Sequence, residues 1–103
     1  MDWIVYRVTE NGKITLGFIE KDILPRRYEA KKKKREWQNA EIEYFEVKSE
    51  NVAHFYQTAL WTKLYPEEAK IVGFEMPVSF DEDRIIWQRF NPNSLDYNEK
   101  GKV

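Results

Sequence analysis

The 103-residue sequence contains no cysteine and a single histidine, His54. Without cysteine the chain can form neither a disulfide framework nor a thiolate metal site, and we expect a reducing compartment, the cytoplasm. A metal site around His54 would need carboxylates alone, and a general base would need an orienting acid and a nucleophile that the sequence does not indicate. Four glycines are too few for a glycine-rich phosphate loop. We therefore expect no metal, no cofactor and no enzymatic activity.

Long apolar runs are absent as well. None approaches the roughly 20 residues that cross a bilayer. The N-terminal segment carries an acid at Asp2 and alternates in polarity, unlike the basic and then apolar segments of a secretion signal. Charged residues make up 34% of the chain, but they nearly cancel to a net charge of −1. We expect no membrane partner and no polyelectrolyte character for the whole chain.

Aromatic residues are plentiful, with four tryptophans, six tyrosines and six phenylalanines. Each buried ring removes roughly 150 to 250 Å² from water, so a chain of this length can build one hydrophobic core. We expect a single compact domain over residues 1–92. Residues 93–103 are rich in turn-forming residues and predict a flexible C-terminal tail.

Three segments have the alternating pattern of β-strands. Asp2–Thr9 and Ile14–Glu20 flank Asn11-Gly12, which is the preferred sequence of a two-residue type I′ hairpin turn. The first of these strands is apolar on both faces, which indicates a central position in the sheet. Glu41–Lys48 alternates in the same way and predicts a third strand.

One helix is predicted from Glu50 to Tyr65, capped by Ser49 or Asn51 and stopped by Pro66. Its main apolar stripe is expected to face the sheet and consists of Val52, Phe55, Tyr56, Ala59, Leu60 and Leu64. Further strands are predicted at Lys70–Phe80 and Arg84–Phe90. The fold class is α+β: a four- to five-stranded, mainly antiparallel sheet with one amphipathic helix packed on one face, in the order ββ, basic connection, β, α, ββ.

The basic connection carries the strongest local charge. Residues 26–35 hold seven basic residues and one acid, a net of +6, so the other residues carry −7 of the total of −1. A helix here would have no apolar stripe to bury, because Tyr28 and Trp37 lie about 180° apart at 100° per residue. The segment is either a solvated connection pinned to the core by these two rings, or a binding site. The binding site would hold an acidic protein, or RNA or single-stranded DNA, by Arg26, Arg27, Lys31, Lys32, Lys33, Lys34 and Arg35 with Tyr28 and Trp37 as stacking platforms.

A second stripe on the predicted helix consists of His54, Thr58, Trp61 and Tyr65. It is either ordinary core under another segment, or a partner-binding surface, since tryptophan and tyrosine are enriched among interface hot spots. We favour a small non-catalytic protein–protein interaction module, a regulator or inhibitor that occupies a partner's surface. RNA or single-stranded DNA binding through residues 26–37 is the alternative. The strand at Lys70–Phe80 could also pair with its copy in a homodimer, although Pro77 disfavours a long ladder.

Overall fold

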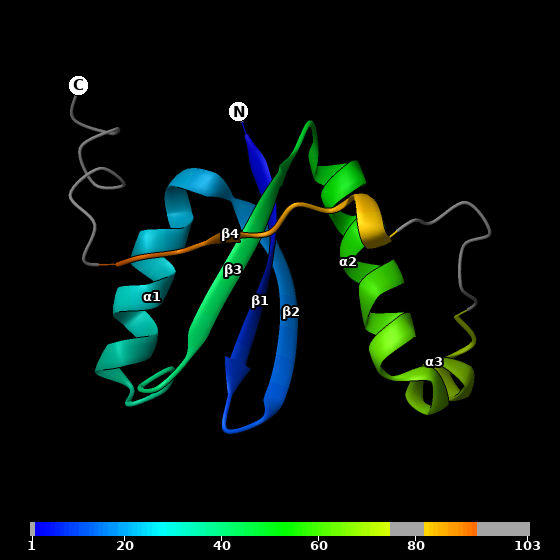
Figure 1. The fold of residues 1–103 in the computed structure, drawn as a ribbon, viewed down its shortest axis with the longest axis horizontal. Coiled ribbons are helices and arrows are strands. Elements are labelled where there is room, and N and C mark those ends of the chain that lie inside the picture. Colours follow the sequence, from blue (N-terminus) through cyan, green and yellow to red (C-terminus); the bar gives the residue numbers. More distant parts are fainter. Residues whose placement is uncertain (1, 75–81, 93–103) are drawn as a thin grey trace.

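The structure, a computed structural model, describes residues 2–74 and 82–92. Figure 1 shows helices on both sides of a sheet whose strand order is β2-β1-β3-β4, with every neighbouring pair antiparallel. The predicted α+β class is therefore confirmed. The elements along the chain are β1 (Trp3–Glu10), β2 (Lys13–Glu20), a 3-10 turn η1 (Lys21–Ile23), α1 (Leu24–Lys33), β3 (Glu41–Val47), α2 (Glu50–Leu64), α3 (Pro66–Val72), a 3-10 turn η2 (Glu82–Arg84) and β4 (Gln88–Arg89).

The β1–β2 hairpin forms where the sequence predicts it. Asn11 and Gly12 have φ values of 53° and 80°, and Glu10 pairs with Lys13 across the two-residue turn. Positive φ at both central positions is what a type I′ turn requires, and its twist matches that of the flanking strands. This turn sets the register of the whole hairpin, from Glu10↔Lys13 at the turn to Trp3↔Glu20 at the open end.

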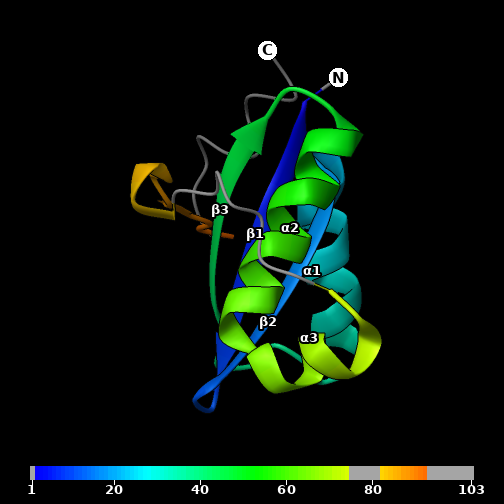
Figure 2. The same cartoon turned by 90° about the vertical axis from the view of Figure 1, so that its right-hand side faces the viewer.

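Strand β1 lies between β2 and β3 and is buried on both faces, so its predicted central position is confirmed. Ile4, Tyr6 and Val8 belong to a core cluster on the α1 side of the sheet, and Val5 belongs to a second cluster on the α2 side. Figure 2, seen from the α2 side, shows α2 in front of the strands and α1 behind them. The molecule thus has three layers, α1, the sheet and α2, with one apolar cluster on each side of the sheet.

Helix α2 begins and ends close to the predicted bounds, and the Ser49 hydroxyl accepts a hydrogen bond from the Val52 amide at 3.3 Å. Its orientation differs from the prediction, because Phe55 and Val52 are exposed. Of the predicted stripe, Ala59 and Leu60 are buried and Tyr56 packs against Phe45, and Ala53, from outside the stripe, joins them in the core. The small, fully buried Ala53 side chain allows a close approach of helix and sheet, with Leu60 and Tyr56 inside the contact and Val52 and Phe55 at its margin.

The basic connection contains helix α1, which the sequence analysis does not predict. Pro25 lies in its first turn, where the missing amide hydrogen costs nothing. Leu24 is fully buried, and Tyr28, one turn later, packs against the same cluster. These two residues at i and i+4 form a short apolar stripe. Trp37 lies beyond the helix, so its angular position on a continued helix is irrelevant.

The C-terminal part departs most from the predicted strands. Lys70–Val72 is helical, as the end of α3, and Glu75–Phe80 falls outside the described residues. The predicted homodimer would pair an edge strand at Lys70–Phe80, but the first three of these residues, Lys70–Val72, form a helix and not a strand. Of Arg84–Phe90, only Gln88–Arg89 pairs with β3. The predicted flexible tail, 93–103, also lies outside the described residues.

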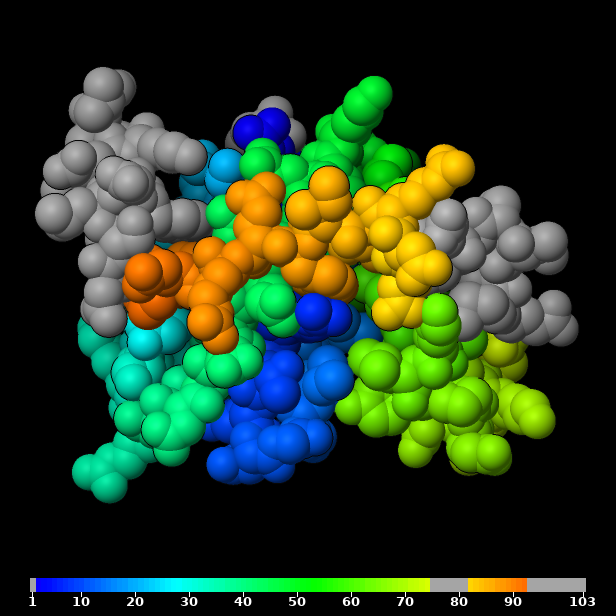
Figure 3. Space-filling model, in the orientation of Figure 1, coloured from blue at the N-terminus to red at the C-terminus, as the bar shows by residue number. Residues whose placement is uncertain are grey.

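Residues 82–92, here called the C-terminal strap, cross the β3 edge from the α2 side to the α1 side (Figure 3). Ile85 and Trp87 pack against the cluster under α2, whereas Phe90 is buried in the cluster under α1. The Phe90 amide donates a hydrogen bond to the Ile42 carbonyl at 2.8 Å. The strap therefore closes both core clusters at the same edge of the sheet.

Gly17 provides a test of how tightly the α1 side is packed. It pairs with Tyr6, and a Cβ added at Gly17 would lie 2.5 Å from the Tyr6 ring. We expect Gly17→Ala to lower the free energy of unfolding by about 1 to 3 kcal/mol in urea titrations, because the ring must move within a packed core. In a Tyr6→Leu background the same change should cost less than about 0.5 kcal/mol, since the clashing ring atoms are gone. Equal costs in both backgrounds would contradict this packing.

Candidate functional site

The predicted partner-binding stripe on α2 lies along strand β2. The His54 ring is exposed on one side and stacks on Phe18 with ring centroids 5.2 Å apart. At the other end of the helix, the Tyr65 hydroxyl donates a hydrogen bond to the Ile14 carbonyl. Both ends of the stripe therefore contact β2, and the stripe helps to hold α2 on the sheet.

The middle of the stripe is also partly buried. The Thr58 carbonyl accepts a hydrogen bond from the Thr62 hydroxyl at 2.8 Å, which satisfies a buried polar group within the helix. The Trp61 ring lies 6.4 Å from that of Tyr65 and 5.9 Å from that of Phe74, to which it is perpendicular. Trp61 is thus the centre of a small aromatic group shared by α2 and the segment after α3.

Helix α3 positions Phe74 beside Trp61. Gly73 takes a left-handed φ of 85°, and the Phe74 amide donates to the Ala69 carbonyl at 2.9 Å. This is a Schellman-type helix end, which turns the chain back along the helix and which glycine adopts without strain. The local sequence Val72-Gly73-Phe74 therefore folds the phenylalanine back toward α2.

An exposed apolar surface results, here called the corner patch. Ile71 is 83% exposed and Phe74 is 49% exposed. We define the patch as Trp61 and Tyr65, whose rings contact each other, together with the exposed residues at the end of α3, Ile71, Val72 and Phe74, of which Phe74 contacts Trp61. The last three residues were missed as site residues in the sequence analysis because Lys70–Phe80 alternates like a strand. The sequence signal that could have identified them is Pro66 followed by Glu67 and Glu68, which is typical of a helix start.

The basic segment lies on the opposite side of the sheet from the α2 stripe (Figure 1), so the structure does not bring the two predicted sites together. Trp37 is only 8% exposed, and its ring meets the Tyr6 ring edge-on at 6.1 Å. Tyr28 is partly buried, with its ring 5.6 Å from that of Phe90. Both rings therefore point into the core, and in this conformation Trp37 offers no surface on which a base could stack.

The basic side chains of this segment divide into two groups. Arg27 donates to the Tyr6 hydroxyl at 3.3 Å, and Lys31 and Lys32 lie over the Trp37 and Tyr28 rings at 5.7 and 5.8 Å. Four others are exposed, and their side chains make no hydrogen bond, ion pair or ring contact within residues 2–74 and 82–92: Arg26, Lys33, Lys34 and Arg35.

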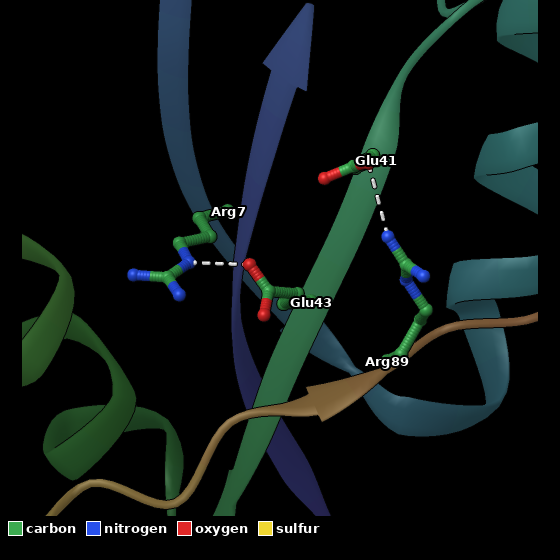
Figure 4. Close-up of polar contacts among 4 residues, drawn as sticks. All are labelled: Arg7, Glu41, Glu43 and Arg89. Atoms are coloured by element: carbon green, nitrogen blue, oxygen red, sulfur yellow. Dashed lines mark hydrogen bonds and ion pairs between the residues drawn. The ribbon is translucent and has the colours of Figure 1, made fainter.

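One ion pair joins β1 to β3 and another joins β3 to the strap (Figure 4). Arg7 donates to Glu43 at 2.9 Å across the β1–β3 pair, and its guanidinium lies 4.0 Å from the centre of the Trp87 ring. Arg89 pairs with Glu41 at 3.1 Å. Arg7 and Trp87 also line a hollow of about 280 Å³ between α2 and the strap, which contains a Lys63–Glu82 ion pair. The charges around this hollow therefore neutralise one another.

Across the part of the chain that the structure describes, no three histidine or carboxylate side chains gather as a metal site would require. None of the described helices combines the length and apolar character of a membrane span. Comparisons with protein-family models, with curated proteins and with solved structures found no match to this chain.

The placement of Trp37 can be tested by stability. We expect Trp37→Ala to lower the free energy of unfolding by about 3 to 5 kcal/mol, because it leaves a cavity beside Tyr6. The measurement is urea unfolding followed by circular dichroism. Arg35→Ala, two residues earlier and exposed, is the control and should change stability by less than about 0.5 kcal/mol. If Trp37→Ala were as mild as the control, the ring would belong to the surface and could stack on a base.

Proposed function

We propose that this protein is a small non-catalytic interaction module, a regulator or inhibitor that occupies the surface of a partner protein. The observation that supports the proposal is the corner patch, where Ile71, Val72 and Phe74 are exposed close together in sequence and the Phe74 ring contacts Trp61. Single exposed apolar side chains are ordinary on protein surfaces, whereas a contiguous group marks an interaction site.

The shape of this region indicates the kind of partner surface. Helix α3 lies at one corner of the molecule, away from the sheet (Figure 2), and Ile71 projects almost fully into solvent. A projecting apolar corner fits a concave surface, so the proposed partner offers an apolar groove that receives Ile71 and Phe74. The Trp61 ring packs perpendicular to the Phe74 ring and holds it in place. A packed aromatic anchor of this kind is typical of interface hot spots.

Charged side chains surround the patch and provide a polar rim. Glu67, Glu68 and Lys70 are exposed on α3, and Lys63 is exposed at the end of α2. Such a rim adds orientation and solubility but little binding energy. Of the binding residues proposed from sequence, Trp61 and Tyr65 belong to the patch, whereas His54 and Thr58 lie farther along α2. The cytoplasm stays the proposed compartment, on the basis of the cysteine-free composition.

The double variant Ile71→Ser, Phe74→Ser tests the proposal. We expect it to lose the partner, with an affinity reduced at least about tenfold, because both side chains would be removed from the centre of the interface. Immobilised wild-type and variant proteins are compared in lysate of the native cell, and a captured protein is then purified and its affinity measured by calorimetry.

Ile86→Ser is the matched control, because Ile86 is 81% exposed and lies on the strap, outside the patch. It should retain the partner. Circular dichroism and urea unfolding of the double variant should stay close to wild type, since Ile71 and Phe74 are largely exposed. If every protein captured by the wild type is also captured by the folded double variant, the corner patch is not the binding surface.

A further inference from the structure

The outer face of helix α1 consists almost entirely of charged side chains. Residues 26–35 carry a net charge of +6, against −7 for the rest of the chain. The residues nearest the core, Leu24, Tyr28 and Trp37, are turned inward onto the sheet. The charge asymmetry seen in the sequence is therefore a spatial one, with a cationic layer on one side of the molecule.

The basic side chains on this face differ in whether they already have a side-chain partner within the protein. Lys31 is paired with Glu36 at 3.4 Å, and Lys32 donates to Gln38 at 3.5 Å. By contrast Arg26, Lys33 and Lys34 have no side-chain partner within the described residues, and Arg35, at a positive φ of 63°, is likewise unengaged and exposed. These four side chains can bind an external anion without breaking an existing contact.

The spacing of the four cations suits a linear polyanion. Arg26 and Lys33 are seven residues apart, two turns of helix, which separates them by about 10.5 Å along the axis. One strand of a nucleic-acid duplex places a phosphate about every 3.4 Å along its axis, so this distance spans about three phosphates. Lys33, Lys34 and Arg35 are consecutive at the C-terminal end of α1, so three of the four cations are close together.

The lack of exposed apolar side chains on this face argues against an acidic protein and against an anionic membrane as the ligand. No large apolar residue between 24 and 40 is exposed, whereas a protein interface needs an apolar or aromatic centre. A helix that lies on a membrane turns its apolar side chains toward lipid, but here Tyr28 and Trp37 pack inside. Interfaces with nucleic-acid backbones are polar and strongly positive, which matches this face.

We propose that the outer face of α1 is a binding site for the phosphate backbone of a nucleic-acid duplex, with Arg26, Lys33, Lys34 and Arg35 as its phosphate contacts. Tyr28 and Trp37 do not contact the ligand. Their rings pack in the core, where they hold the segment on the sheet, and Lys32 and Lys31 lie over them. Binding should be independent of base sequence, because the four proposed contacts are to phosphates, which carry no sequence information. This site is separate from the corner patch, and either can exist without the other.

The test is fluorescence anisotropy of a labelled 20-base-pair random duplex over a range of salt concentrations. With four phosphate contacts, the slope of log K against log salt should be about −3 to −4. The double variant Lys33→Gln, Lys34→Gln should reduce the steepness of the slope by about 2 and weaken binding at 50 mM salt at least about tenfold. Both side chains are exposed, so the fold should be preserved, as circular dichroism would verify.

The matched control is Lys48→Gln, Lys70→Gln, which removes the same charge from exposed positions outside α1. It should keep the wild-type slope. Equal weakening by the two double variants would show an effect of net charge alone and would overturn the proposed site, as would the absence of duplex binding at 50 mM salt.

Three further probes distinguish the class of ligand. A single strand of the same length should bind more weakly than the duplex and should not quench tryptophan fluorescence, because Trp37 is buried. Tighter binding of the single strand with quenching would mean that the rings stack on bases. Poly-glutamate and phosphatidylserine vesicles should compete poorly; equal affinity for either would replace the duplex with an acidic protein or a membrane surface.

Discussion

The structure depends on one constraint, the burial of β1 on both of its faces. Ile4 and Val5 are adjacent in sequence, point to opposite sides of the sheet and are both fully buried. A strand of this kind needs an apolar cover on each side, because exposing either face would return several large side chains to water. Helix α2 supplies one cover. Helix α1 and Trp37 supply the other, and this requirement orders the otherwise very polar segment that follows the hairpin.

The sequence predicts the parts of the fold that rest on local chemistry. Asn11-Gly12 specifies the hairpin, alternation specifies β3, and Ser49 with Pro66 delimits α2. The first strand, apolar on both faces, already implies a second covering layer, but the basic segment offers few apolar residues to form it. Leu24 and Tyr28 were sufficient, because two residues one turn apart can anchor a ten-residue helix on a sheet. Such tertiary stabilisation is not visible in the periodicity of the segment itself.

The candidate sites were predicted less well, for two physical reasons. The rotation of α2 depends on which side chain allows the closest approach, and Ala53 determines it in place of the larger Phe55. In addition, the alternation within Lys70–Phe80 predicts a strand, whereas Lys70–Val72 forms the end of helix α3. The difference lies in Gly73, whose left-handed conformation ends α3 and returns Phe74 to Trp61. The rotation of α2 is a property of packing between elements, whereas the end of α3 is local and is indicated in the sequence by Pro66 and Gly73.

The distribution of aromatic rings explains why the two surfaces differ in character. On the α1 side, the Tyr6 ring lies across Gly17, receives a hydrogen bond from Arg27 and meets Trp37, so the rings near this helix are used within the core. The groups left outside are mainly charged, and an attraction through these is screened by salt. On the α2 side, Phe45 and Leu60 fill the space beneath the helix, and Trp61 and Phe74 are left at its end. Contact through these rings removes apolar area from water and depends little on salt. Because the sheet separates the two surfaces (Figure 1), a partner on one would not cover the other, so the two proposed sites are independent of each other.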